Sequence, residues 1–143
     1  MAALVNSVDI EAPGEVVFDY AVDLSNELEW GTPVRIVKLT DGPVQVGSRF
    51  DAEWKNGGPI EVDYVAADRP RRWATLGRGQ RMDVNLSADV QDLGPTRSRL
   101  TVTMELLPHG WLRALLPVLK LAMQKTDERN LAALKGRATP TAA

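Results

Sequence analysis

The chain of 143 residues contains no cysteine and a single histidine, His109. Without cysteine it can form no disulfide, offers no thiolate nucleophile and cannot bind a metal through sulfur. One histidine cannot form a histidine cluster either, so we expect neither a metal site nor a cofactor. Phenylalanine is also scarce, with two residues against four tryptophans and two tyrosines. The aromatic side chains are therefore mostly ones that carry a polar atom.

The sequence also lacks an excess of either charge and any long apolar run. Seventeen basic and nineteen acidic side chains give a net charge of -2, so we predict no nucleic-acid partner. The longest apolar segment, residues 111–123, is interrupted by Arg113, Pro117 and Lys120 and is too short to span a bilayer. The first residues do not resemble a secretory signal. We therefore predict a cytoplasmic protein without integral membrane association.

Alternation of apolar and polar residues predicts a series of strands. The first covers residues 5–11 and the second residues 34–39. Further alternating stretches cover residues 50–54, 60–66, 82–90 and 100–106, with a short strand around Trp73. Asn56-Gly57 predicts a hairpin turn, and Gly77-Arg78-Gly79 predicts another turn. About seven antiparallel strands result.

Two segments have helical periodicity instead. Pro13 suits a helix start, and Asp19, Asp23 and Glu27 are predicted on the solvent face. The expected buried stripe of this first helix comprises Val16, Val17, Tyr20, Ala21 and Leu24. The stripe of the C-terminal helix comprises Leu112, Leu115, Leu116, Leu119, Met123, Leu131 and Leu134.

The two ends of the C-terminal helical segment carry their own signals. Pro117 predicts either a break between a short helix and a longer one or a bend that opens a pocket. Gly136 predicts the end of the helix, and residues 137–143 a tail. No repeat or linker is visible, so residues 1–143 are expected to form a single domain, with its core over residues 3–136.

These elements predict an α+β fold. A sheet with one apolar face needs a cover, and the C-terminal helix is the only long apolar stripe available. We therefore expect a curved antiparallel sheet of about seven strands wrapped around that helix, with two short helices after the first strand.

Several local motifs carry a resemblance to a known family. A strand runs into Ala12-Pro13, and Trp30 closes the segment that follows. A Gly-Pro-Val-Gln-Val-Gly loop spans residues 42–47, and Gly-Pro-Thr precedes the last strand at residues 94–96. In this order the chain resembles the START-like (SRPBCC) superfamily, and within it the polyketide cyclase/dehydrase-type proteins. The resemblance implies the helix-grip fold and an apolar pocket between the sheet and the last helix.

A ligand in such a pocket would contact the inward-facing side chains, although these could equally form a filled core. Methionine adapts to irregular surfaces, and a buried indole or phenol needs a polar partner that a pocket can supply. The predicted ligand-binding residues are Trp30, Phe50, Trp54, Val62, Tyr64, Trp73, Met82, Val84, Met104, Leu116, Leu119 and Met123.

Three functions remain open at this stage. The first is non-catalytic binding of a small hydrophobic or aromatic molecule, lipid-like or polyketide-like. The second is an aromatase/cyclase-type enzyme, as the resemblance implies, with Tyr64, Arg71 and His109 as candidates for proton transfer or ligand contact. The third is a protein-interaction module, which an exposed apolar patch on the last helix would favour. The residues predicted outward on that helix are charged instead, namely Arg113, Lys120, Lys125, Asp127, Glu128 and Arg129. No family catalytic motif is present, and the oligomeric state is not predicted.

Overall fold

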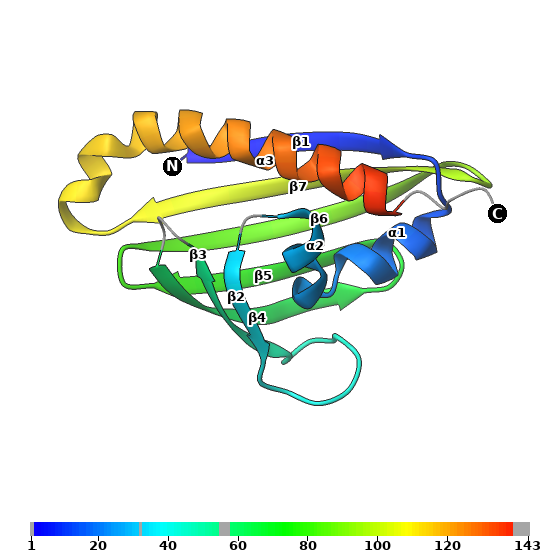
Figure 1. The fold of residues 1–143 in the computed structure, drawn as a ribbon, viewed down its shortest axis with the longest axis horizontal. Coiled ribbons are helices and arrows are strands. Elements are labelled where there is room, and N and C mark those ends of the chain that lie inside the picture. The colour runs from blue at the N-terminus through cyan, green and yellow to red at the C-terminus, as the bar shows by residue number, and fades with distance from the viewer. Residues whose placement is uncertain (1, 32, 55–57, 139–143) are drawn as a thin grey trace.

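The structure is a computed structural model that describes residues 2–31, 33–54 and 58–138. Within these residues it forms one antiparallel sheet of seven strands, with the helices on its concave side (Figure 1). The strands are β1 (Ala2–Ile10), β2 (Pro33–Lys38), β3 (Arg49–Trp54), β4 (Gly58–Asp68), β5 (Arg72–Gly79), β6 (Met82–Gly94) and β7 (Arg97–Pro108). The helical elements are α1 (Gly14–Ala21), η1 (Leu24–Asn26), α2 (Glu27–Trp30), η2 (Gly110–Leu115) and α3 (Leu116–Ala138).

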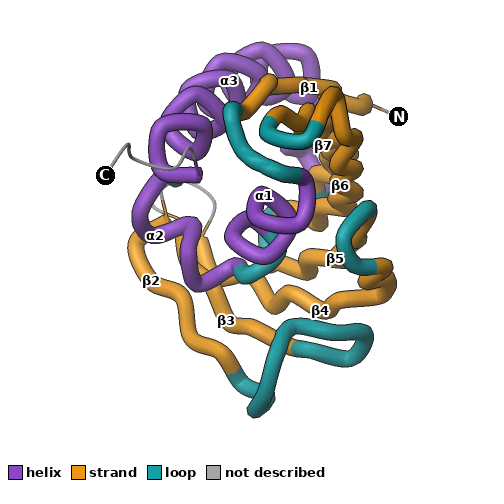
Figure 2. Tube along the Cα trace, turned by 90° about the vertical axis from the view of Figure 1, so that its right-hand side faces the viewer, coloured by secondary structure: helices purple, strands orange, loops and turns teal. Residues whose placement is uncertain are grey.

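The strand order across the sheet is β1-β7-β6-β5-β4-β3-β2. Every neighbour pair except β1 with β7 consists of strands that follow one another in the sequence, as antiparallel pairing allows. Viewed end-on, the sheet curves around α1 while α3 lies beside β1 (Figure 2). The α+β class, the seven strands and the helix-grip arrangement predicted from the sequence are confirmed.

The predicted turn at residues 77–79 is wrong, because these residues form the end of β5. The turn comes one residue later, at Gln80 and Arg81. A Cβ atom on Gly79 would lie 2.7 Å from the carbonyl oxygen of Met82, so glycine is needed here for close backbone approach. The other predicted turn, Asn56-Gly57, lies outside the described residues.

The segment after β1 is shorter and more broken than its periodicity predicts. Helix α1 ends at Ala21, and the Asp23 carboxylate then caps η1 by accepting a 2.9 Å hydrogen bond from the Ser25 N–H. Val16 is exposed, whereas Phe18, absent from the predicted stripe, is buried. The break rotates α2 relative to α1, so the predicted solvent-facing position of Glu27 is wrong, as described below.

Pro117 lies in the first turn of α3, where its missing N–H leaves no helical bond unmade. The preceding η2 is a separate 3₁₀ segment, which confirms the predicted break between a short and a longer helix. The predicted end at Gly136 is wrong, since α3 continues to Ala138. Leu115 also departs from the predicted stripe, because it is exposed.

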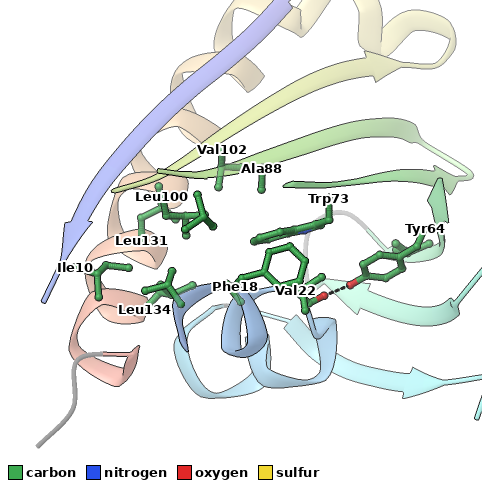
Figure 3. Packing of buried hydrophobic residues seen from close by; sticks show 14 of the residues in the cluster. Ile10, Phe18, Val22, Tyr64, Trp73, Ala88, Leu100, Val102, Leu131 and Leu134 are labelled. Carbon is green, nitrogen blue, oxygen red and sulfur yellow. Dashed lines mark hydrogen bonds between the residues drawn. The ribbon is translucent and has the colours of Figure 1, made fainter. Parts of the chain in front are cut away.

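The packed core lies where α1 and the C-terminal half of α3 meet the sheet (Figure 3). The Phe18 ring meets Trp73 edge to face, with centroids 5.3 Å apart and planes at 84°. Leu131 and Leu134 enter the same cluster from α3. This end of the molecule is closed by side chains from three elements.

Candidate functional site

The concave side of the sheet divides into two halves that differ in packing. Four of the predicted ligand-binding residues belong to the packed core, each at most 7 % exposed. They are Phe50, Val62, Tyr64 and Trp73. Trp54 is half-buried and packs against the same cluster. Trp30 ends α2, and its side chain lies outside the described part of the structure. In this half the inward-facing side chains form a filled core, which was the alternative to a ligand pocket.

We call the other half the open half and define it by inward-facing apolar residues that stay half-exposed. On the sheet they are Met82, Val84, Leu86 and Met104, and on α3 they are Leu116, Leu119 and Met123. Except for Leu86, which packs against the edge of the core, none belongs to the buried cluster. The sheet and the N-terminal half of α3 therefore leave apolar surface within reach of solvent.

The strand register explains why the sheet presents these residues together. Val84 of β6 pairs with Leu106 of β7 and with Gly77 of β5, so all three face the same side. Gly77 and Gly79 contribute no side chain to that side of β5. The Ile60 side chain of β4 covers both glycines, since its carbon atoms lie 3.1 Å from a Cβ built on Gly77 and 3.2 Å from one built on Gly79.

A polar network crosses the interior between β1 and α3. The Asn6 amide donates a 2.6 Å hydrogen bond to Asp127 Oδ2, and the Gln124 amide donates to Asn6 Oδ1 at 2.5 Å. Asn6 and Asp127 are each 8 % exposed, so the predicted outward position of Asp127 on the last helix is wrong. Burial raises the pKa of Asp127, the nearby Glu128 charge adds to this, and the Asn6 hydrogen bond opposes it.

Glu27 brings a second carboxyl group into the same region, from α2. Its Oε2 atom is shielded from solvent and has no hydrogen-bond partner among the described residues. Burial, with a further contribution from the Asp127 charge, raises the pKa of Glu27 to about 7. Glu27 was missed from the sequence because the helical periodicity of α1 was continued through residue 27, whereas the helix is interrupted at η1.

The structure does not bring the three proposed catalytic candidates together. Tyr64 is buried, and its hydroxyl donates a hydrogen bond to the Val22 carbonyl (Figure 3). Burial raises the pKa of the Tyr64 phenol. Arg71 is exposed just before β5, whereas His109 contacts Gln80 just after it. Arg71 and His109 are thus separated by the length of β5, roughly 25 Å at the rise of an extended strand.

His109 is held at the β5–β6 turn. Its Nδ1 atom lies 3.0 Å from the Gln80 carbonyl oxygen, and its Nε2 atom lies 3.2 Å from Asp83 Oδ1. The Gln80 carbonyl, followed by the Asp83 carboxylate, raises the pKa of His109 because both partners favour the protonated ring. These contacts suit a structural role for the imidazole at the end of the sheet.

The outward face of η2 and the first half of α3 is less charged than the sequence predicts. Four large apolar side chains on this stretch are exposed, between 40 and 76 %. They are Trp111, Leu115, Val118 and Leu121. They follow one another at steps of three or four, so they form a stripe beside the basic side chains Arg113 and Lys120.

The remaining features of the described residues do not indicate a functional site next to α3. Two surface hollows are present, one around Arg71 and Gln91 and one around Asp51 and Arg78, and neither lies against α3. No group of three or more potential metal-ligating side chains occurs in the described residues. Among the same residues, no helix is long and apolar enough to cross a membrane.

Comparison with known proteins now identifies the family. The chain is a helix-grip protein. It belongs to the family described as polyketide cyclase / dehydrase and lipid transport, whose model matches residues 1–139. No curated protein matches its sequence.

Solved structures support the same fold. A START superfamily protein from Mycobacterium smegmatis is 18 % identical, with a TM-score of 0.74 over 95 % of this chain and 96 % of its own. The Zhui aromatase/cyclase from Streptomyces sp. R1128 is 14 % identical, with a TM-score of 0.81 over 96 % and 93 %. At these identities the likeness establishes the fold and leaves the activity open.

Proposed function

We propose that this protein binds a small hydrophobic or aromatic molecule, lipid-like or polyketide-like, between the sheet and α3, without catalysing a reaction on it. The observation that carries the proposal is the exposure of inward-facing apolar side chains such as Val84, Met104 and Leu119. Covering apolar surface is favourable by about 25 cal/mol per Å². A ligand in the open half would supply the cover that the chain itself does not provide.

The test is the mass of the protein purified gently from its own host, measured under native and then denaturing conditions. We expect a difference of a few hundred daltons, the mass of one drug-sized ligand. A Val84→Trp variant should lose this difference because the indole would occupy the open half. Equal masses for the wild type, together with no shift in melting temperature from lipids or aromatic compounds, would reject the proposal.

An aromatase/cyclase-type enzyme is the second candidate, favoured by the likeness to an aromatase/cyclase structure and by buried carboxyl groups in the interior. Tyr64, Arg71 and His109 remain the predicted proton-transfer or contact residues. Turnover of a polyketide chain by the wild type, lost in a Tyr64→Phe, His109→Ala double variant that still folds, would support it. Unchanged turnover in that variant would remove these residues from the mechanism.

A protein-interaction module is the third candidate, and the exposed stripe at Trp111, Leu115, Val118 and Leu121 favours it. Sedimentation at increasing concentration would detect self-association through this stripe, and a Val118→Lys variant should then abolish it. The cytoplasmic location stays a prediction.

A further inference from the structure

Asp127 is buried, the Oε2 atom of Glu27 is shielded from solvent, and neither carboxyl group has an ion-pair partner among the described residues. The only charged group that shifts the pKa of Glu27 is Asp127, and the only one that shifts the pKa of Asp127 is Glu128. Neither Glu27 nor Asp127 takes part in an ion pair within the described residues. Buried carboxylates are normally paired with a basic group or a metal. No ion pair supplies the compensating charge within residues 2–31, 33–54 and 58–138.

Asp127 lies next to the open half on α3. The inward stripe of α3 is half-exposed up to Met123 and fully buried from Asp127 onward. On β7 the neighbouring inward side chains differ as well, since Met104 is half-exposed and Val102 is buried, although Leu106 beyond Met104 is buried too. Asn6, the partner of Asp127, pairs with Val102 in the sheet register. The carboxyl pair therefore lies where the open half meets the packed core.

Glu27 reaches the same place from the opposite side. Helix α2 packs against α3, the Asp127 charge raises the pKa of Glu27, and the Glu27 charge raises the pKa of Tyr64 of β4. Its Oε2 atom, without a partner among the described residues, is a hydrogen-bond acceptor shielded from solvent on a helix that contacts α3 and β2. A buried acceptor without a donor costs free energy until a donor arrives.

We propose that Glu27 and Asp127 form an anchor for a basic amine on the ligand, at the inner end of the open half. This inference rests on the proposed function, since it specifies the polar group of the same hydrophobic ligand. The apolar body would lie against Met104 and Met123, and the ammonium group would donate hydrogen bonds to Glu27 Oε2 and the Asp127 carboxylate. An ammonium supplies both the missing donor and the missing charge.

An alcohol would satisfy the acceptor but not the charge, and a carboxylic acid would add a third acid to the site. The order of affinity expected for one alkyl chain is therefore amine, then alcohol, then acid. Bringing one charge against an oppositely charged buried group changes affinity roughly tenfold or more.

Amine binding should also release a proton. Without ligand, burial and the Asp127 charge disfavour the charged form of Glu27, and the Glu27 charge in turn disfavours the charged form of Tyr64. An ammonium reverses this balance and favours the Glu27 carboxylate. The affinity for an amine should therefore increase as the pH rises through the neutral range, and the affinity for an alcohol should not.

The experiment compares decylamine, decanol and decanoic acid, below their micelle concentrations, by isothermal titration calorimetry at pH 6 and pH 8. The proteins are the full-length wild type, Glu27→Gln and the control Glu29→Gln. Glu29 lies on the same helix with an exposed side chain, so its change tests a loss of charge outside the anchor. Thermal unfolding of each variant shows that it is folded.

We expect decylamine to bind the wild type and Glu29→Gln roughly tenfold more tightly than decanol, with a larger margin at pH 8. Glu27→Gln should lose that margin while decanol binds as before. Equal binding of amine and alcohol to the wild type, or an unchanged amine preference in Glu27→Gln, would overturn the anchor and leave hydrophobic binding intact. Binding of none of the three compounds would overturn the proposed function and the anchor with it.

Discussion

The Tyr64 hydroxyl donates a hydrogen bond to the backbone carbonyl of Val22, the residue that caps the C-terminal end of α1. The bond joins the middle of β4 to the end of α1 across 42 residues of sequence. Both groups are buried, so neither can exchange this bond for one with water. The bond helps to hold α1 against the sheet at the packed core.

Replacing Tyr64 by phenylalanine should therefore lower the free energy of unfolding. Loss of the donor leaves the Val22 carbonyl buried without its partner, at a cost of about 1–3 kcal/mol. Tyr20→Phe is the matched control, because its hydroxyl bonds to Glu29 at an exposed position and its loss should cost under about 0.5 kcal/mol. Urea denaturation measures both. Equal effects of the two substitutions would show that the bond to Val22 contributes nothing particular.

The buried Glu27 carboxyl should make stability depend on pH. In the unfolded chain Glu27 loses its proton near 4.5, whereas in the folded protein it keeps the proton up to about 7. Between these values the folded state binds more protons, so the free energy of unfolding falls as the pH rises. The contribution is complete below about 4.5 and is lost by about 7, and it amounts to on the order of 3 kcal/mol.

Glu27→Gln should remove this part of the pH dependence, whereas Glu29→Gln should retain it. The comparison requires urea denaturation of the three proteins at a series of pH values between 4 and 8. Asp127, whose pKa is also raised, contributes in the same direction and should keep a residual slope at the acidic end in every variant. A wild-type stability that stays level or increases over this range would contradict the burial of Glu27.

The packed and open halves predict opposite effects of shortening a leucine on α3. Leu131 is 3 % exposed in the packed core, so Leu131→Ala should cost about 2–5 kcal/mol. Leu119 is half-exposed in the open half, so Leu119→Ala should cost less than about 1.5 kcal/mol. Denaturation curves give both values. Under the proposed function, Leu119→Ala should nevertheless weaken binding of decanol or decylamine more than its stability loss suggests. Similar stability losses in both variants would mean that the open half is packed.

Two glycines test the corrected boundaries of β5 and α3. Gly136 lies inside α3 with nothing within 4 Å of an added Cβ, so Gly136→Ala should raise stability by up to about 1 kcal/mol. In Gly79→Ala the new Cβ would lie 2.7 Å from the Met82 carbonyl oxygen, which should cost more than about 1 kcal/mol. Thermal unfolding measures the two changes. A loss of stability in Gly136→Ala would indicate that the helix ends at Gly136, as the sequence predicts.

Much of the fold could be predicted from the sequence because its signals are local. Alternation along residues 82–90 and 100–106 marks strands with one apolar face, and such a face requires a cover. The helical spacing of Leu119, Met123, Leu131 and Leu134 identifies that cover. Pro117 likewise marks a helix start through the absence of its own N–H. The family could be predicted on the same basis, from turn and entry motifs.

The site was predicted less well, since its properties depend on which residues meet from distant parts of the chain. All the predicted lining residues with described side chains face inward or lie on α3, but Phe50 and Val62 are packed while Met82 and Met104 are half-exposed. Periodicity assigns a face and cannot tell how much of that face another element covers.

What the sequence determined by itself is the list of elements, the faces they bury and the class of fold, because backbone propensity and side-chain alternation act within a few residues. Only the tertiary structure decided the burial of the Glu27 carboxyl group and hence its pKa. A break after Ala21 rotates α2, α3 passes close by, and the carboxyl group becomes enclosed beside Asp127, 100 residues later in the chain. The charge and burial of a side chain are set by neighbours in space, and these are fixed only when the whole sheet has wrapped around the helix.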